Sequence, residues 1–442
     1  MSFLIFSKSS SALFGGPKIA RNLFAIRKLA TVSDSPVHSS PFVPPVTSST
    51  SSLAALKLKS GQIFKGTSFG ASKSAIGEAV FTTSLVGYPE SMTDPSYRGQ
   101  LLVFTQPLIG NYGVPGMAKD KYGLLKYFES EAIHCRGIIV SDYATKYSHW
   151  NAVESLGEWC TRYNIPAISG VDTRAIVHVL RDQGSTLGQL AIGSQDIEAP
   201  VTQFEDPNQS NLVAEVSTKV PIEFNPEGNL KIAVVDCGIK QNIIRCLVSR
   251  GAHVTLLPWD YDYNKEAHKY DGLFISNGPG SPTALGATVN HLRNAINTFN
   301  KPIFGICMGN LVLGLAAGLD SYKLRFGNRG HNQPAVNVVN GQCVITSQNH
   351  GYALKDDNLP LGWEKYFINA NDGSNEGIRH LTKPIRSVQF HPEAKGGPQD
   401  TEYLFNEFLD EVRADKIKRH GADYIVEETI PTQRERIAVA VA

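Results

Sequence analysis

The 442-residue chain lacks the features that mark several classes of protein. It has no run of about 18 or more apolar residues, so the sequence predicts no membrane span. Its formal net charge is only +1, so no global basic or acidic field indicates nucleic-acid binding. The six cysteines form no C-x-x-C pair and match neither a zinc site nor a compact disulfide framework. This usage predicts a reducing compartment, where one cysteine can remain a reactive thiol.

Acidic residues are missing from residues 1–33, which carry several serines and five lysines or arginines. An acid-free, arginine-bearing composition is typical of a mitochondrial presequence, and it predicts a location in the mitochondrial matrix. A disordered basic tail is the alternative interpretation. Residues 34–52 are rich in serine, proline and threonine, which predicts a flexible linker because such a segment cannot build a core.

A β-rich α/β domain is expected over residues 53–204, followed by a polar linker with three prolines over residues 205–229. Runs of β-branched and apolar residues between turn residues predict the strands, and helix-capping residues support the helices. The expected strands are 55–64, 78–85, 100–106 and 137–141, and the expected helices are 152–163 and 173–181.

Strand and helix patterns alternate over residues 230–415, which predicts a doubly wound, mainly parallel sheet with helices on both faces. In such sheets ligands bind at the carboxyl ends of the strands. Residues 416–442 form a tail to which no role is assigned. The expected strands are 231–237, 253–258, 272–276, 302–306 and 387–390, and the expected helices are 240–249, 289–299 and 308–317.

Cys307 lies at a predicted strand-to-helix corner, with Gly305 and Gly309 on either side. A corner this sharp needs backbone without side-chain bulk, which the two glycines supply. The positive end of the following helix favours the thiolate over the thiol. These features indicate a cysteine nucleophile, although an isolated G-x-C-x-G is also compatible with a small buried cysteine in a turn.

Two other loops follow predicted strands of the same sheet: the segment 276–282, SNGPGSP, and the H-P-E at residues 391–393. His391 could take the thiol proton and return it to a leaving amine, and Glu393 could hold the imidazole tautomer. The backbone N–H groups of Gly280 and Met308 could together form an oxyanion hole.

The segments SNGPGSP, FGICMGN and FHPE, in this order, resemble class I (triad) glutamine amidotransferases over about residues 230–415. The loop VGYPESMTDPSY at residues 86–97, continued by IGNYG at residues 109–113, extends the resemblance over the first domain. There the sequence is similar to the small, glutamine-hydrolysing subunits of carbamoyl-phosphate synthases. With the predicted presequence, the resemblance points to the mitochondrial form that serves arginine biosynthesis.

The resemblance implies that Cys307 is the nucleophile, His391 the general base and acid, and Glu393 the residue that orients His391. It implies no metal. Shortly after the corner at Cys307, where the family usually has a glutamine, this chain has Leu311, whose side chain cannot form a hydrogen bond. One lost neutral hydrogen bond predicts glutamine binding weakened about 2- to 13-fold, but not a dead site. The glutamine contacts that the resemblance implies are Ser96, Gly278, Gly280, Met308, Asn349, Gly351 and Tyr352.

No Walker-type G-x-x-x-x-G-K-[ST] occurs in the chain, which predicts no ATP site and no cofactor of its own. The resemblance implies a large-subunit partner, in a heterodimer or higher assembly, that uses bicarbonate, ATP and Mg²⁺ and receives ammonia through an internal passage. Three alternatives stay open: a catalytically silent scaffold, a stand-alone cysteine hydrolase, and the amidotransferase of another synthase, such as those that make anthranilate or guanylate. A glutaminase assay separates the first, and the domain at residues 53–204 argues against the other two.

Overall fold

The computed structural model describes residues 52–421. The predicted presequence, almost all of the linker over residues 34–52, and most of the predicted tail lie outside the described residues. Within residues 52–421, no helix is both long and apolar enough to cross a membrane.

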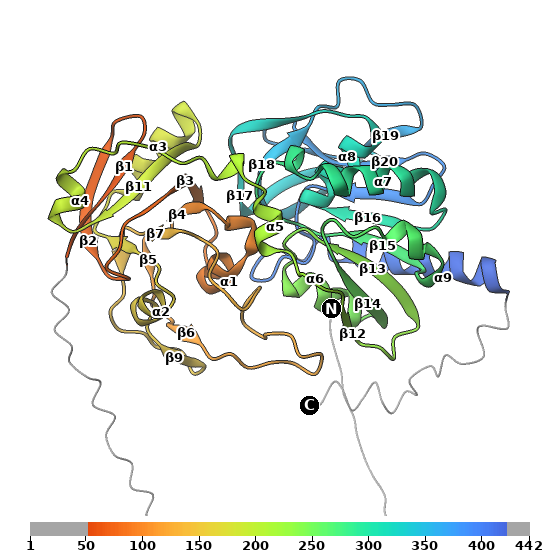
Figure 1. The fold of residues 1–442 in the computed structure, drawn as a ribbon, viewed down its shortest axis with the longest axis horizontal. Helices are drawn as coiled ribbons and strands as arrows, with labels where there is room; N and C mark the ends of the chain where they lie inside the picture. The colour runs from red at the N-terminus through yellow and green to blue at the C-terminus, as the bar shows by residue number, and fades with distance from the viewer. Residues whose placement is uncertain (1–51, 422–442) are drawn as a thin grey trace, which may run out of the picture. The chain divides into compact units, whose positions relative to one another are not determined.

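Seven strands of the N-terminal domain close into a barrel (Figure 1). The residues expected as one strand, 55–64, form a hairpin instead, because the chain turns at Gly61, whose φ of +100° favours glycine. The other expected strands correspond to β3, β4 and β7, with shifted ends. In barrel order the strands are β1 (Leu53–Leu58), β11 (Thr186–Ile192), β3 (Ala75–Thr82), β4 (Gln100–Phe104), β7 (Gly137–Ile139), β10 (Ala167–Ser169) and β2 (Ile63–Ser68).

One helix expected in this domain, 152–163, starts later than predicted. Residues 152–154 form a strand, and the helix begins at Leu156, where a capping box fixes its start. The Ser155 side chain accepts the Glu158 N–H while the Glu158 carboxylate accepts the Ser155 N–H. The remaining elements are α1 (Tyr88–Thr93), α2 (Leu156–Arg162), α3 (Thr173–Gln183), α4 (Ser194–Glu198) and two short strand pairs, β5 (Leu108–Ile109) with β8 (Asp142–Tyr143) and β6 (Val114–Pro115) with β9 (Ala152–Glu154).

The segment expected as a linker, residues 205–229, contains two regular elements besides the short 3₁₀ helix η2 (Pro207–Gln209). One is the short helix α5 (Leu212–Val216), and the other is β12 (Ile222–Phe224). β12 pairs antiparallel with β14 and therefore forms an edge of the sheet of the second domain. A polar, proline-containing composition concealed this pairing, since an edge strand needs little apolar content.

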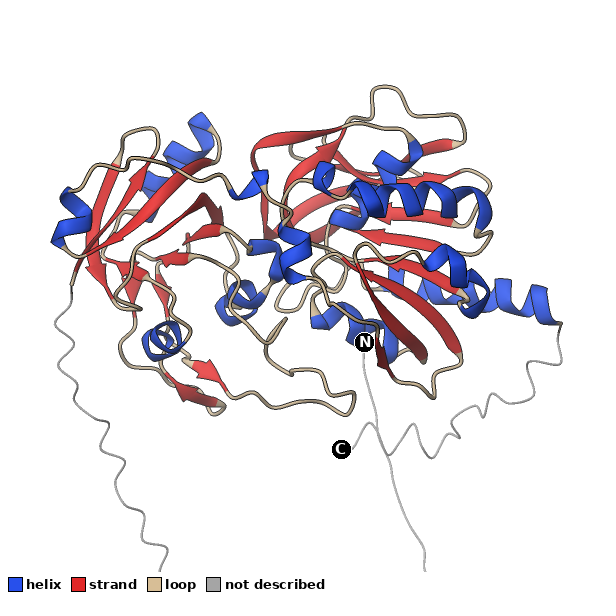
Figure 2. Cartoon of the chain, viewed as in Figure 1, coloured by secondary structure: helices blue, strands red, loops and turns tan. Residues whose placement is uncertain are grey.

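The second domain is built on a ten-stranded sheet (Figure 2). Five neighbouring strands from β14 to β21 are parallel, as expected, and an antiparallel extension from β20 to β18 was not foreseen. In sheet order the strands are β12, β14 (Ala252–Pro258), β13 (Leu230–Asp236), β15 (Gly272–Ile275), β16 (Ile303–Ile306), β21 (Ile385–Val388), β20 (Asn375–His380), β19 (Trp363–Asn369), β17 (Ser321–Asn337) and β18 (Cys343–Leu354).

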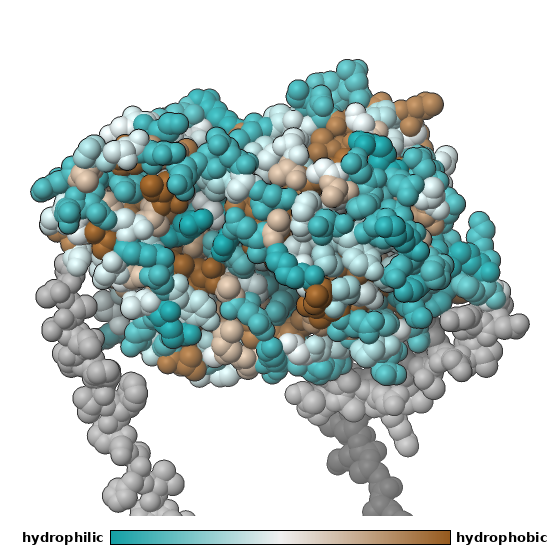
Figure 3. All heavy atoms as spheres, in the orientation of Figure 1, coloured by the Kyte–Doolittle hydropathy of each residue, from teal (hydrophilic) through white to brown (hydrophobic). Residues whose placement is uncertain are grey.

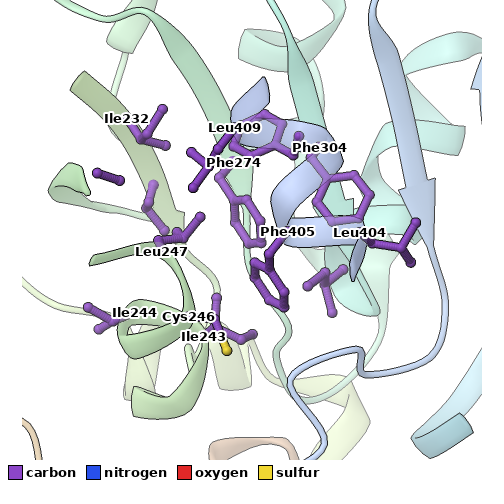
Figure 4. Close-up of a cluster of buried hydrophobic side chains, with 14 of the residues drawn as sticks. Ile232, Ile243, Ile244, Cys246, Leu247, Phe274, Phe304, Leu404, Phe405 and Leu409 are labelled. Atoms are coloured by element: carbon purple, nitrogen blue, oxygen red, sulfur yellow. The ribbon is translucent and has the colours of Figure 1, made fainter. Parts of the chain in front are cut away.

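Helices cover both faces of the parallel part, as the alternation along β13 shows. Ile232 and Val234 pack with α6 (Gln241–Val248) and α9 (Tyr403–His420), whereas Ala233 and Val235 pack with α7 (Gly286–Thr298) and α8 (Met308–Ala317). Figure 4 shows the cluster on the face covered by α6 and α9, in which aromatic rings of α9 lie against rings of β15 and β16. α9 extends to His420, beyond the expected domain end at residue 415.

Hydrophilic residues cover most of the face drawn in Figure 3, with hydrophobic residues in separate patches. The buried hydrophobic residues form four clusters, two in the N-terminal domain and one on each face of the ten-stranded sheet.

Candidate active site

The corner that carries Cys307 is as tight as the sequence predicts. Cys307 joins β16 to α8 with a φ of 55° and a ψ of −101°, a conformation that costs a non-glycine residue about 1–3 kcal/mol. A Cβ on Gly305 would lie 2.7 Å from the carbonyl of Gly309, and a Cβ on Gly309 would lie 2.3 Å from the carbonyl oxygen of Ile275. Glycine is therefore required on both sides of the cysteine.

His391 and Glu393 follow β21, the parallel neighbour of β16, so both reach the carboxyl end of the sheet beside Cys307. The Nδ1 of His391 lies 2.7 Å from the Oε1 of Glu393. The Nε2 of His391 is buried and has no hydrogen-bond partner among the described residues, which leaves it free to exchange a proton. All three side chains are almost fully buried.

Charges decide the protonation of His391. Burial and the Lys240 ammonium lower the pKa of His391, but the negative charges of Glu393 and Cys307 outweigh them and raise it to about 10. The imidazole therefore holds its proton beside the Cys307 sulfur over the neutral pH range. An ion pair between a thiolate and an imidazolium is the form in which a cysteine acts as a nucleophile.

Lys240 is a member of the site that the sequence reasoning missed. It lies just before α6, and its Nζ is 2.6 Å from the Oε1 of Glu393, with both side chains buried. Burial alone would raise the pKa of Glu393, but Lys240 and His391 hold it well below its usual range. The carboxylate thus bridges Lys240 and His391. The position of Lys240 in the sequence, just after the predicted strand 231–237, could have indicated that it lies at the ligand-binding edge of the sheet.

A loop of the barrel domain completes the site. The Ser96 hydroxyl accepts a hydrogen bond of 2.9 Å from the Asn277 side chain, and the Ser96 N–H donates to Asp94. The same carboxylate accepts a hydrogen bond of 3.0 Å from the Asn349 side chain. Ser96 and Asn349, both expected to contact glutamine, are therefore brought together by residues from two domains.

The other expected contacts come from two segments of the second domain. A Cβ on Gly278 would lie 1.9 Å from the Cys237 carbonyl oxygen, so only glycine fits there, and Gly280 has a φ of +81°. Met308 begins α8, where the first backbone N–H groups have no partner within the helix. The carbonyl oxygen of Asn349, on β18, lies 3.7 Å from the Sγ of Cys307.

Two further positions on β18 are Gly351 and Tyr352. Tyr352 is half-buried against the apolar cluster that contains Met308 and Leu311. No hydrogen bond joins Gly351 or Tyr352 to the triad within the described residues. Their expected role therefore stays a prediction from the resemblance.

The side chains of Asn310 and Leu311, which follow the corner at Cys307, offer no free polar atom to a ligand. Leu311 is 2% exposed within the apolar cluster that covers α7 and α8. Asn310 is fully buried, and its amide is used by Gln389 and Ser387 at 2.8 Å each. Weakened glutamine binding at Leu311 therefore stays a prediction.

A cavity of about 40 Å³ lies between the barrel loop and the triad histidine. It is large enough for about one small polar molecule of the size of water. Burial raises the pKa of Glu90 on its wall to about 7, although Lys395 acts in the opposite direction. No group of three His, Cys, Asp or Glu side chains among residues 52–421 is placed to hold a metal ion. The lining includes Ser84, Glu90, Asp94, Glu129, Lys240, Ser347, His331, His391 and Lys395.

Comparisons with known proteins show the family to which the chain belongs. Residues 56–190 match the family described as carbamoyl-phosphate synthase small chain, CPSase domain, and residues 233–411 match glutamine amidotransferase class-I. A carbamoyl phosphate synthase arginine-specific small chain of Chaetomium globosum is 53% identical, covering 93% of this chain and 89% of the relative. Its counterpart in Neurospora crassa is 55% identical, covering 87% and 86%.

Among solved structures, a putative GMP synthase protein from Thermoplasma acidophilum is 26% identical, with a TM-score of 0.37. That match covers 43% of this chain and 96% of the other.

Proposed function

Because this chain belongs to the family of carbamoyl-phosphate synthase small chains, we propose that it hydrolyses glutamine and supplies the ammonia to a large subunit that makes carbamoyl phosphate. The observation that supports this most strongly is the buried group of Cys307, His391 and Glu393 at the carboxyl end of one sheet. The relatives' names extend the proposal to the arginine-specific enzyme.

In the proposed reaction, the Cys307 thiolate attacks the side-chain amide carbon of glutamine, and a C–S bond forms. The N–H groups of Gly280 and Met308 bind the negative oxygen of the tetrahedral intermediate. His391 then donates its proton to the amide nitrogen, the C–N bond breaks and ammonia leaves.

The thioester that remains is cleared by water. His391, now neutral, takes a proton from the water molecule as its oxygen attacks the thioester carbon, and glutamate leaves as the C–S bond breaks. Glu393 keeps the imidazole oriented through the cycle and favours its protonated form, and Lys240 holds the Glu393 carboxylate in place. Ser96, Gly278, Asn349, Gly351 and Tyr352 hold the amino-acid end of glutamine.

The partner is proposed to be the large subunit, which binds ATP and Mg²⁺ and receives ammonia through an internal passage. The composition of residues 1–33 supports the mitochondrial matrix as the location. Deleting these residues should keep a tagged protein in the cytosol. Unchanged import would refute their role as a presequence, and a cytosolic full-length protein would refute the location. A catalytically silent scaffold is the alternative, and a complete triad argues against it.

Cys307→Ser tests the proposal in the complex with the large subunit. Glutamine-dependent synthesis of carbamoyl phosphate should be lost, whereas synthesis from added ammonia should persist because the ammonia-using step lies in the partner. Cys343→Ser is the matched control, since Cys343 is exposed and far along the chain from the triad. Equal loss of both activities in Cys307→Ser would refute the division of labour.

A further inference from the structure

Arg329 is a buried cation beside the candidate active site that the proposed reaction does not use. It lies on β17 opposite Asn349 of β18, the residue whose carbonyl oxygen is 3.7 Å from the Cys307 sulfur. The residue is 6% exposed. Burial lowers the pKa of Arg329. Among the neighbouring groups that act in the opposite direction, Glu78 has the largest effect.

The protein uses little of the guanidinium group. Its Nη1 donates one hydrogen bond of 2.7 Å to the Phe326 carbonyl oxygen, and its Nε is buried without a partner. No carboxylate oxygen of residues 52–421 lies within 4.0 Å of its nitrogens. A buried charge without a counter-ion is costly, so the group is suited to an anion that arrives with a ligand.

Two glycines leave room for the guanidinium group. A Cβ on Gly327 would lie 2.4 Å from Nη1, and a Cβ on Gly351 would lie 3.2 Å from Nη2. The free side of the guanidinium group therefore faces Gly351, one of the positions expected to contact the amino-acid end of glutamine. In glutamine the α-carboxylate is separated from the reacting amide carbon by only Cα, Cβ and Cγ.

We propose that Arg329 binds the α-carboxylate of the substrate glutamine. This inference rests on the proposed function and names a residue for the amino-acid end of the same site. An arginine–carboxylate pair forms hydrogen bonds between charged groups, and losing one reduces affinity by about 10- to 150-fold. The hydrogen bond missing at Leu311 accounts for only about 2- to 13-fold, so Arg329 offsets it.

A structural role is the competing explanation, because the Nη1 hydrogen bond also holds the irregular part of β17 between Lys323 and Asn328. The two roles differ in their ligand dependence. A side chain that only supports the strand changes the use of every substrate alike, whereas a carboxylate-binding side chain changes the use of carboxylate-bearing substrates alone.

The test uses the full complex and two substrates, L-glutamine and L-glutamine α-amide, which replaces the carboxylate with an uncharged carboxamide. The KM of wild type should be lower for glutamine. In Arg329→Gln the KM for glutamine should rise about 10- to 150-fold, with a much smaller change in kcat, and the preference over the α-amide should disappear. Arg329→Lys should restore part of the preference.

Arg325→Gln is the matched control, because Arg325 is an exposed arginine of the same strand. An unchanged KM in Arg329→Gln, or an equal rise for both substrates, would overturn the inference. Equal KM values for the two substrates in wild type would also overturn it, because no group of the site would then distinguish the α-carboxylate. Absence of glutamine hydrolysis by wild type would instead contradict the proposed function.

Discussion

Replacing Glu393 with glutamine removes one negative charge from the centre of the site while keeping the shape of the side chain. The lost carboxylate is shared by two cationic neighbours, at 2.7 Å from the His391 Nδ1 and 2.6 Å from the Lys240 Nζ. The substitution therefore changes protein stability, the protonation of His391 and the rate of hydrolysis together.

The expected loss of stability follows from Lys240. Removing one partner of a buried ion pair costs about 3–5 kcal/mol, because the other charge stays buried and unpaired. The charges of Asp94 and Glu129 still act on Lys240, so we expect the lower end, about 3 kcal/mol, in the free energy of unfolding.

The expected loss of activity follows from His391. General acid–base catalysis contributes about 10²- to 10⁴-fold, and a misoriented imidazole forfeits much of it. The Glu393 charge also raises the pKa of His391, so its removal lowers that pKa. Since His391 must be protonated when ammonia leaves, the alkaline limb of the glutaminase pH profile should move to lower pH.

Urea unfolding measures the stability, and glutamate release across a pH series measures the profile. The double variant Glu393→Gln with Lys240→Met supplies the control: it removes the unpaired charge and should regain most of the stability but none of the activity. The reasoning is refuted if the double variant is as unstable as Glu393→Gln, or if the alkaline limb does not move.

Two other predictions concern the elbow and the cavity wall. Gly309→Ala should lower the free energy of unfolding by about 1–3 kcal/mol and abolish glutaminase activity, because its Cβ would lie 2.3 Å from the Ile275 oxygen. Gly286→Ala is the control and should be tolerated, because a Cβ on Gly286 would have no atom within 4 Å. Equal losses of stability and activity in the two variants would contradict this prediction. Burial raises the pKa of Glu90 from 4.5 to about 7, so wild type should lose stability as pH rises through this window. The Glu90→Gln variant should not lose stability in this window. Parallel curves of stability against pH for wild type and the variant would contradict the prediction.

Short sequence patterns predicted the parts of the fold and site that are determined by residues close together in the sequence. The Gly305 and Gly309 pair predicts the corner because the requirement for small side chains is written into adjacent positions. The strand alternation predicts that His391 reaches the same sheet edge as Cys307, since parallel strands end together. The capped helix α3 likewise begins at the expected residue, Thr173.

Long-range partners could not be predicted in this way. Lys240 and Glu393 are far apart in the sequence, and no local motif marks a lysine that enters a triad. Arg329 lies in a strand of the antiparallel extension, whose register is interrupted by irregularities, so its neighbours across the sheet were not readable. The hairpin at Gly61 was missed because the polar segment that makes the turn, residues 59–62, is short and has apolar residues on both sides.

The hydrogen bonds from Asn277 to Ser96 and from Asn349 to Asp94 tie each half of the glutamine site to the other. A chimaera that joined the barrel of one relative to the amidotransferase domain of another would inherit a pocket made of mismatched halves unless both pairs travelled with it. The glutamine site is therefore shared by the two domains, although each has a hydrophobic core of its own.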